Sequence, residues 1–139
     1  MAEKELAELL FLVSKRLRHG YVARLVPLGL NPGQARALRA LADADRPMRM
    51  VRLADELRIV PRSLTPVMDA LEQSGLALRQ VDPANRRSTL VVITPEGRAM
   101  SERARDARRQ AGEELFAVLS GDQREQLGEL LGLVDGQFR

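Results

Sequence analysis

The chain has 139 residues and a net charge of +3, with 45% apolar and 29% charged residues, a composition typical of a globular domain and not of a disordered segment. The absence of cysteine excludes disulfides and thiolate metal sites, and a single histidine argues against a histidine metal site or a Ser-His-Asp triad. No apolar run is long enough to cross a membrane and the start lacks the cationic region of a signal peptide, so we expect a cytoplasmic protein without metal or cofactor.

The first part of the sequence predicts three helices. Apolar residues at helical spacing predict an amphipathic helix over residues 6–25. A second helix begins at Asn31, which caps it in a capping box with Gln34. A short third helix, residues 51–57, follows an extended residue pair near Met48.

A fourth helix and a β-hairpin come next. The helix has a polar first turn and ends at Gly75. Two strand-like runs, residues 76–81 and 89–94, are joined by a loop over residues 82–88 that contains a proline and two adjacent arginines. A helix with an exposed polar start, followed by a hairpin with a cationic tip, is the form of a winged helix. Such a helix fits the DNA major groove, and such a tip reaches phosphate or the minor groove.

The last third of the sequence predicts two further helices. Thr94 and Pro95 open a long helix, and after a break at Gly121 the last helix is built on apolar residues between 127 and 134. The outer helices carry apolar stripes that are best buried against each other and against a second chain. We therefore expect a mainly α fold with a small β-hairpin wing (α+β), in which the N- and C-terminal helices form a dimerisation region.

Charge is distributed unevenly along the chain. Residues 15–24 carry four basic side chains and no acid, and residues 98–109 carry five arginines against two acids. Residues 113–139 carry six acids and two arginines. This segregation predicts a basic face that meets a polyanion and an acidic end held away from it.

Four segments in this order resemble the multiple antibiotic resistance regulator (MarR) family of bacterial transcription factors: LGLNPGQARALRALA, LADELRIVPRSLTPVMDALEQSGLALR, DPANRRSTLVVITPEGRAM and LSGDQREQLGELLGLV. The run DPANRRS, followed by a strand and TPEG, stands where the family has its wing. The resemblance implies one MarR-like domain over residues 1–139, with a winged helix-turn-helix lobe at 31–94 and a helical dimerisation region at 1–30 and 95–139. It also implies a homodimer that binds pseudo-palindromic operators in double-stranded DNA. A small-molecule effector, often phenolic or otherwise aromatic, is expected to weaken that binding.

The fourth helix has the first candidate DNA contacts. Arg62, Ser63 and Thr65 lie in its polar first turn, where they suit base edges and phosphate, with Arg62 the candidate for a guanine. The alternative is a solvated first turn in which Ser63 only caps the helix. Asp69 would repel phosphate, so it either pairs with an arginine and orients it or forms an ordinary exposed acid pair with Glu72.

The hairpin has the second set of candidate DNA contacts. A planar, weakly hydrated guanidinium suits a narrow A·T-rich minor groove, which is the role predicted for Arg86 and Arg87. The alternative is the charged tip that any soluble hairpin shows. Arg79 on the first strand is predicted to add a phosphate contact.

The sequence departs from the MarR pattern at two predicted contact positions. Asn85 stands where the family commonly has an aspartate, and an asparagine forms no ion pair with Arg87. Pro66 stands in the recognition helix where a polar or basic residue is common, and it removes one backbone donor and one potential phosphate contact.

The first helix has the candidate effector site. The resemblance places effector pockets between the dimer arms and the DNA-binding lobe, where Lys15, Arg16 and His19, with Tyr21, would give a basic lining for an anionic aromatic ligand. The alternatives are a solvated helix face and, for His19, a pH sensor.

Three classes of function follow from these residues. The first is a ligand-responsive transcriptional regulator, usually a repressor. The second is a winged-helix protein-interaction module without specific DNA binding, an alternative that Asn85 and Pro66 support. The third, an enzyme, is disfavoured because the sequence has no nucleophile with its base, no set of metal ligands and no phosphate loop.

Overall fold

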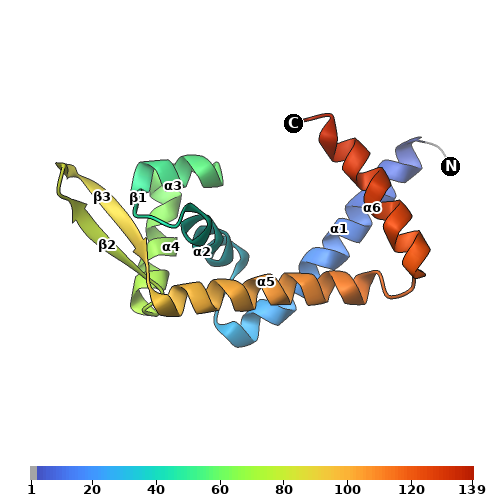
Figure 1. The fold of residues 1–139 in the computed structure, drawn as a ribbon, viewed down its shortest axis with the longest axis horizontal. Coiled ribbons are helices and arrows are strands. Elements are labelled where there is room, and N and C mark those ends of the chain that lie inside the picture. Colours follow the sequence, from blue (N-terminus) through green and yellow to red (C-terminus); the bar gives the residue numbers. More distant parts are fainter. Residues whose placement is uncertain (1–2) are drawn as a thin grey trace.

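The computed structural model describes residues 3–139, which form a mainly helical fold with a small antiparallel sheet, as predicted (Figure 1). The helices are α1 (Glu3–Leu25), α2 (Pro32–Ala44), α3 (Met50–Leu57), α4 (Pro61–Gln73), α5 (Pro95–Leu115) and α6 (Gly121–Gly136), with a 3-10 helix (Val26–Leu28) after α1. The strands are β1 (Met48–Arg49), β2 (Ala77–Asp82) and β3 (Asn85–Ile93). Within the described residues, no helix has the length and apolar character needed to span a membrane.

The helix starts follow from local capping chemistry. The Asn31 side chain accepts a hydrogen bond from the Gln34 N–H at 2.9 Å, and the Gln34 side chain accepts one from the Asn31 N–H at 3.0 Å. The predicted capping box at α2 is therefore confirmed. At α5, the Thr94 hydroxyl accepts from the Gly97 N–H at 3.0 Å and donates to the Gly75 carbonyl at 2.7 Å. Thr94 thus starts α5 and fastens it to the turn that follows α4.

The sheet has three strands in the order β1-β3-β2. The extended pair predicted near Met48 is strand β1, whose Met48 pairs with Val91 of β3. Strand β2 pairs with β3 from Ala77 opposite Ile93 to Val81 opposite Thr89, with a register shift at Asp82. The short β1 ties the base of the hairpin to the start of α3.

The hairpin is longer and its turn is tighter than the sequence predicted. The prediction of a loop over residues 82–88 is wrong, because β2 includes Asp82 and β3 begins at Asn85. The Asp82 carboxylate accepts from the Ala84 N–H at 2.9 Å, and the Asn85 side chain accepts from the Arg87 N–H at 3.1 Å. These two bonds close the turn locally, so Arg86 and Arg87 lie on strand β3 beside the tip.

The core lies where α2, α3 and α4 meet the sheet. Leucines dominate it, and its fully buried side chains include Leu25, Leu38, Leu41, Leu53, Leu64, Met68, Leu71 and Val91. Helix α5 packs on this lobe and on α1 through small residues, with Ala104, Ala107 and Ala111 all buried. Small side chains let the helices approach closely, which fixes the lobe at one end of α5.

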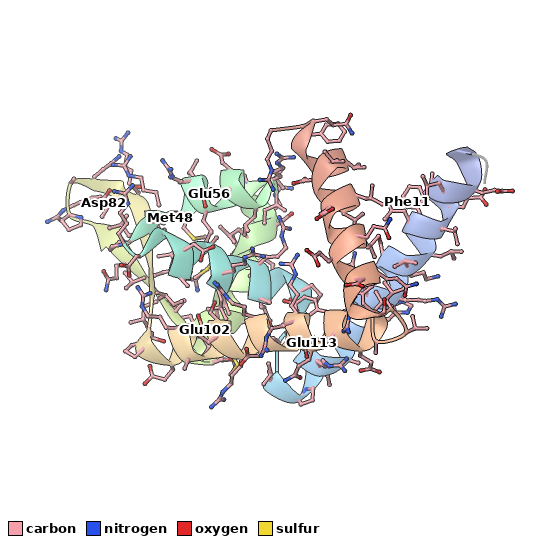
Figure 2. All side chains as sticks on the ribbon, turned by 45° about the vertical axis from the view of Figure 1, so that its right-hand side comes forward. Phe11, Met48, Glu56, Asp82, Glu102 and Glu113 are labelled. Atoms are coloured by element: carbon pink, nitrogen blue, oxygen red, sulfur yellow. The ribbon has the colours of Figure 1, made fainter. Side chains whose placement is uncertain are left out.

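The other end of α5 has helices with little cover. Figure 1 shows α1 and α6 at the end of α5 opposite the wing, and none of the residues of α6 is buried. Asp82 of the hairpin and Phe11 of α1 lie at opposite ends of the molecule (Figure 2). The large apolar side chains exposed on α1 and α6 are Leu6, Leu9, Leu10, Phe11, Leu12, Val13, Leu130, Leu131, Leu133 and Val134.

Candidate nucleic-acid interface

Helix α4 buries one face and exposes the other. Leu64, Met68 and Leu71 point into the core, as the sequence predicted. Arg62, Thr65, Pro66 and Asp69 are exposed on the opposite side, and their spacing of three, one and three residues puts them along one stripe. This stripe, here called the α4 face, is the surface that a duplex groove would meet.

The start of α4 is open to a ligand. Val60 precedes the helix and Pro61 is its first residue, and no side chain caps it. Ser63 does not act as the cap: it follows Val60 within the first turn, where its N–H bonds to the Val60 carbonyl at 2.9 Å. Arg62 is exposed and has no ion pair among the described residues. The first turn therefore presents an unpaired guanidinium at a helix start that no side chain caps, a combination that suits phosphate or a guanine edge.

Pro66 lies within α4 without ending it, since the helix continues to Gln73. It has no N–H to donate to the Arg62 carbonyl one turn earlier, and its exposed ring is part of the α4 face. At this position the α4 face is apolar and carries no charge.

Arg79 is held by two carboxylates of α4. Its guanidinium is 2.6 Å from the Asp69 carboxylate and 3.4 Å from that of Glu72, and its backbone N–H donates to Glu72 at 2.8 Å. Two hydrogen bonds from Arg79 lower the pKa of Glu72, first the one from its backbone N–H and second the one from its guanidinium. In turn, hydrogen bonds to the carboxylates of Glu72 and then Asp69 raise the pKa of Arg79. Asp69 therefore pairs with an arginine, the first of its two predicted roles, while the Arg79 side chain is only 28% exposed.

The hairpin presents two unpaired arginines. Arg86 and Arg87 are exposed, and neither has an ion pair within residues 5–139. Because successive residues of a strand point to opposite faces, the two guanidinium groups leave β3 on different sides of the wing. Asn85 holds the backbone of Arg87 through a neutral hydrogen bond, which replaces the ion pair that an aspartate would offer.

Two residues that the sequence did not single out position the wing. Asp82 is buried, and its carboxylate is 3.3 Å from the guanidinium of Arg49 on β1. The same carboxylate caps the hairpin turn through the Ala84 N–H. An aspartate just before a proline is a turn signal that identifies Asp82 from sequence, but only the pairing of β1 with β3 brings Arg49 to it.

A second candidate site lies where α1, α2 and α5 meet. A cavity of about 330 Å³ opens there, lined by Tyr21, Ala35, Arg39, Ser101, Ala104, Arg105, Arg108 and Arg109. Burial raises the pKa of the Tyr21 hydroxyl, while the charges of Arg108 and Arg39 act in the opposite direction. Among the arginines of the lining, Arg108 is the one for which the described residues offer no ion pair. The cavity thus combines an aromatic hydroxyl with an available cation.

Of the residues predicted for an effector, Tyr21 lines this cavity and the other three do not. Lys15, Arg16 and His19 are exposed on α1, whereas Tyr21 is partly buried. Residues two apart on a helix point in nearly opposite directions, so a wall that includes Tyr21 excludes His19. The signal for the other wall was the spacing of Ser101, Ala104, Arg105 and Arg108 along one face of α5.

Comparison with protein families and known sequences gives a consistent result. The model of the MarR family matches residues 30–89. The HTH-type transcriptional regulator MhqR of Bacillus subtilis is 32% identical over 79% of this chain and 77% of its own length. The HTH-type transcriptional repressor Rv2887 of Mycobacterium tuberculosis is 29% identical over 91% of this chain and 90% of its own.

Solved structures agree with the sequence comparison. Wild-type MarR from E. coli in its apo form superposes with a TM-score of 0.82 at 26% identity, covering 93% of this chain and 95% of that one. Rv2887 in complex with DNA superposes with a TM-score of 0.76 at 28% identity, over 93% of this chain and 96% of that one. Rv2887 has also been solved with p-aminosalicylic acid, and that structure has a TM-score of 0.73 at 28% identity over 94% and 98% of the two chains.

Proposed function

The chain belongs to the MarR family, and from this premise we propose that it is a transcriptional repressor which binds a pseudo-palindromic operator as a homodimer and is released by a small anionic aromatic ligand. At the coarser level it is a DNA-binding transcriptional regulator, the class to which its relatives are assigned by name. Regulators of this family are not enzymes. The repressor role, the operator and the ligand are what the proposal adds.

One observation carries the DNA-binding proposal: exposed arginines without an ion pair stand at both points that a winged helix presents to a duplex, the start of the recognition helix and the wing. Arg62 stands at the open start of α4, and Arg86 and Arg87 stand on the wing. A helix start suits the major groove and an arginine on a narrow hairpin suits the minor groove, so one lobe would read both grooves of a half-site. The related Rv2887 has been solved in complex with DNA, which supports DNA as the partner of this chain.

DNA binding and dimerisation are assigned to different parts of the chain. We assign residues 31–94 to the DNA-binding lobe and residues 1–30 and 95–139 to dimerisation. The exposed apolar side chains of α1 and α6 support this assignment, because a surface of that kind on a monomer favours aggregation unless a partner covers it. A second copy of the chain presents the same surface, as a two-fold symmetric interface requires.

The ligand is assigned to the cavity between α1, α2 and α5. Arg108 would pair with a carboxylate, and the partly buried Tyr21 would offer its hydroxyl and ring to an aromatic acid. The complex of Rv2887 with p-aminosalicylic acid supports an anionic aromatic as the ligand class. Lys15, Arg16 and His19, which were predicted from the sequence, would lie outside this binding site.

An electrophoretic shift tests the DNA-binding proposal. The full chain is titrated onto DNA from upstream of its own gene and onto random DNA of the same length at moderate salt. We expect a shift specific to the upstream DNA. No sequence-dependent shift would favour the alternative, a winged-helix protein-interaction module. Pro66 and Asn85 support that alternative, because Pro66 removes a potential phosphate contact and Asn85 removes an ion pair with Arg87.

A linked titration tests the ligand. Salicylate binding is measured by calorimetry on the free protein and on the protein saturated with operator. If a ligand weakens DNA binding, reciprocity requires that DNA weaken the binding of that ligand by the same factor. Equal affinity in both states would remove salicylate as an inducer, and an Arg108→Gln variant that binds it unchanged would remove the assigned cavity.

A further inference from the structure

Three charged side chains meet between the recognition helix and the wing, away from the unpaired arginines. Asp69 and Glu72 stand three residues apart on α4, and Arg79 reaches them from β2. The Asp69 carboxylate takes the guanidinium at 2.6 Å. The Glu72 carboxylate takes both the guanidinium, at 3.4 Å, and the backbone N–H of the same residue, at 2.8 Å. We call this group the α4–β2 cluster.

The contacts of Glu72 fix geometry as well as charge. A carboxylate that accepts from the backbone and the side chain of one residue holds that residue's position and orientation together. Arg79 is the third residue of β2, and only Ser74, Gly75 and Leu76 separate that strand from the end of α4. The cluster therefore links the recognition helix α4, which would enter the major groove, directly to the wing, which would enter the minor groove.

The charge balance of the cluster argues against a DNA contact by Arg79. Two carboxylates surround one guanidinium, so the group has a net charge of −1 and does not attract phosphate. Asp69 is also part of the α4 face, with 60% of its side chain exposed. Without Arg79, that carboxylate would stand unneutralised beside any phosphate that approached α4.

We propose that Arg79 is a positioning residue, which locks the angle between the recognition helix and the wing and masks Asp69, and that it does not contact DNA. This inference rests on the proposed function and deepens it, because it replaces the phosphate contact predicted for Arg79. Arg62 and the wing arginines then reach their grooves together only while the α4–β2 cluster is intact.

The test is a mutant cycle in which the affinity for operator DNA and its dependence on salt are measured for each variant. Operator binding is measured by fluorescence anisotropy from low to moderate salt for the wild type, Arg79→Gln, the double variant Asp69→Asn/Glu72→Gln, and the triple variant. We expect Arg79→Gln to weaken binding roughly tenfold, in the range seen for residues that share one network. In the background without the two carboxylates, we expect Arg79→Gln to change affinity less than twofold and to leave the salt slope unchanged.

A phosphate contact gives a different pattern. Each phosphate contact that is lost reduces the slope of log affinity against log salt by about 0.9. If Arg79→Gln lowers the affinity and the slope equally in both backgrounds, Arg79 binds phosphate and the proposal is overturned. If none of the variants changes operator binding, the cluster has no role in positioning and the proposal also fails.

The controls separate this inference from the function on which it rests. Arg98→Gln removes an arginine of α5 that pairs with Asp45 at 2.8 Å, so it makes the same charge change in a comparable ion pair outside the lobe's DNA-facing side. We expect it to bind operator as the wild type does. Thermal unfolding identifies any variant that is not folded, and Arg79→Lys, which keeps the charge, serves as the second variant and is expected to restore part of the affinity. A wild-type protein that binds no operator would contradict the proposed function itself, whereas the inference fails only through the cycle.

Discussion

The arginines of the lobe differ in what surrounds them, and this difference distinguishes their roles. Arg62 is unpaired at the open start of α4, whereas Arg79 is enclosed by carboxylates. The sequence identified both as cations near DNA, because residue type and spacing are visible in it. It did not reveal which of them already had a partner, since the partners of Arg79 come from another element.

Arg62→Ala is expected to reduce discrimination between operator and random DNA. If Arg62 reads a guanine, the loss of discrimination is about 1–3 kcal/mol, because a bidentate contact to one base is lost while phosphate contacts remain. Anisotropy titrations with both DNAs at one salt concentration measure it. An equal loss of affinity for the two DNAs would show that Arg62 anchors phosphate.

Charge reversal on the wing is expected to act on every DNA. Arg86→Glu and Arg87→Glu each replace an unpaired cation with an anion, so binding weakens for operator and random DNA alike and its salt dependence becomes shallower. Salt titrations of both variants check this. If only operator binding falls, the arginines read sequence-dependent groove shape and contribute little to general attraction.

Pro66→Ala is expected to stabilise the fold. A proline within a helix costs up to about 3 kcal/mol relative to alanine, because it removes a backbone hydrogen bond and its ring crowds the preceding turn. We expect the free energy of unfolding to rise by about 1–3 kcal/mol in urea at a fixed protein concentration. An unchanged midpoint would mean that the start of α4 has adapted fully to the ring.

Among the elements, the helices and the presence of a hairpin were predicted, but the extent of the loop between its strands was not. Capping residues and apolar spacing are local signals, which is why the starts of α2 and α5 agree with the prediction. Residues 85–88 have low strand propensity and were assigned to a loop. They form part of β3 because pairing with β2 and the bonds of Asp82 and Asn85 extend the ladder to the turn, a tertiary effect that overrides propensity.

The contact between α5 and the start of β2 depends on one glycine. A Cβ at Gly97 would lie 2.0 Å from the Leu76 carbonyl oxygen and 2.8 Å from Ile93. Because the Leu76 carbonyl oxygen belongs to the backbone, it cannot move aside, and Gly97→Ala forces α5 away from the sheet. We expect the free energy of unfolding to fall by about 1–3 kcal/mol or more. Gly112→Ala on the same helix is the control, because no atom lies within 4 Å of its added Cβ. Destabilisation by both variants alike would indicate that the close approach at Gly97 is not the cause.

At the level of the whole molecule, the sequence predicted that the outer helices expose apolar stripes. It did not predict that α5 would hold these helices at a distance from the DNA-binding lobe. The stripes of α1 and α6 were visible as periodicity, and Figure 1 shows that α5 separates them from the wing. The family resemblance placed the effector pocket only between the dimer arms and the DNA-binding lobe. The residues of α1 that line the cavity depend on how this helix is rotated about its own axis. Packing against other helices sets that rotation, so the sequence of α1 alone does not reveal it.

Charged substitutions among the exposed apolar side chains of α1 and α6 are expected to separate the proposed dimer. Phe11 of α1 is 77% exposed and Leu133 of α6 is 75% exposed, and burial of such side chains against a partner contributes about 1.5–3 kcal/mol each. Phe11→Glu and Leu133→Glu should therefore raise the dimer dissociation constant by roughly tenfold or more. Sedimentation velocity over a micromolar concentration range measures it. Val51→Glu on α3, where the side chain is 62% exposed but lies in the lobe, is the matched control and should leave the dimer intact.

Loss of the dimer should carry a specific penalty in DNA binding. Two lobes in a dimer read half-sites whose centres are about 34–36 Å apart, one turn of the duplex, so the second lobe binds at high effective concentration once the first is in place. Phe11→Glu should thus lose operator affinity while a single half-site is bound as by the wild type. Inserting about five base pairs, half a helical turn, between the half-sites should weaken the wild type in the same way, because the second half-site then faces away from its lobe. A wild-type protein that sediments as a monomer at micromolar concentration, or an operator that tolerates the insertion, would contradict the dimeric mode of binding.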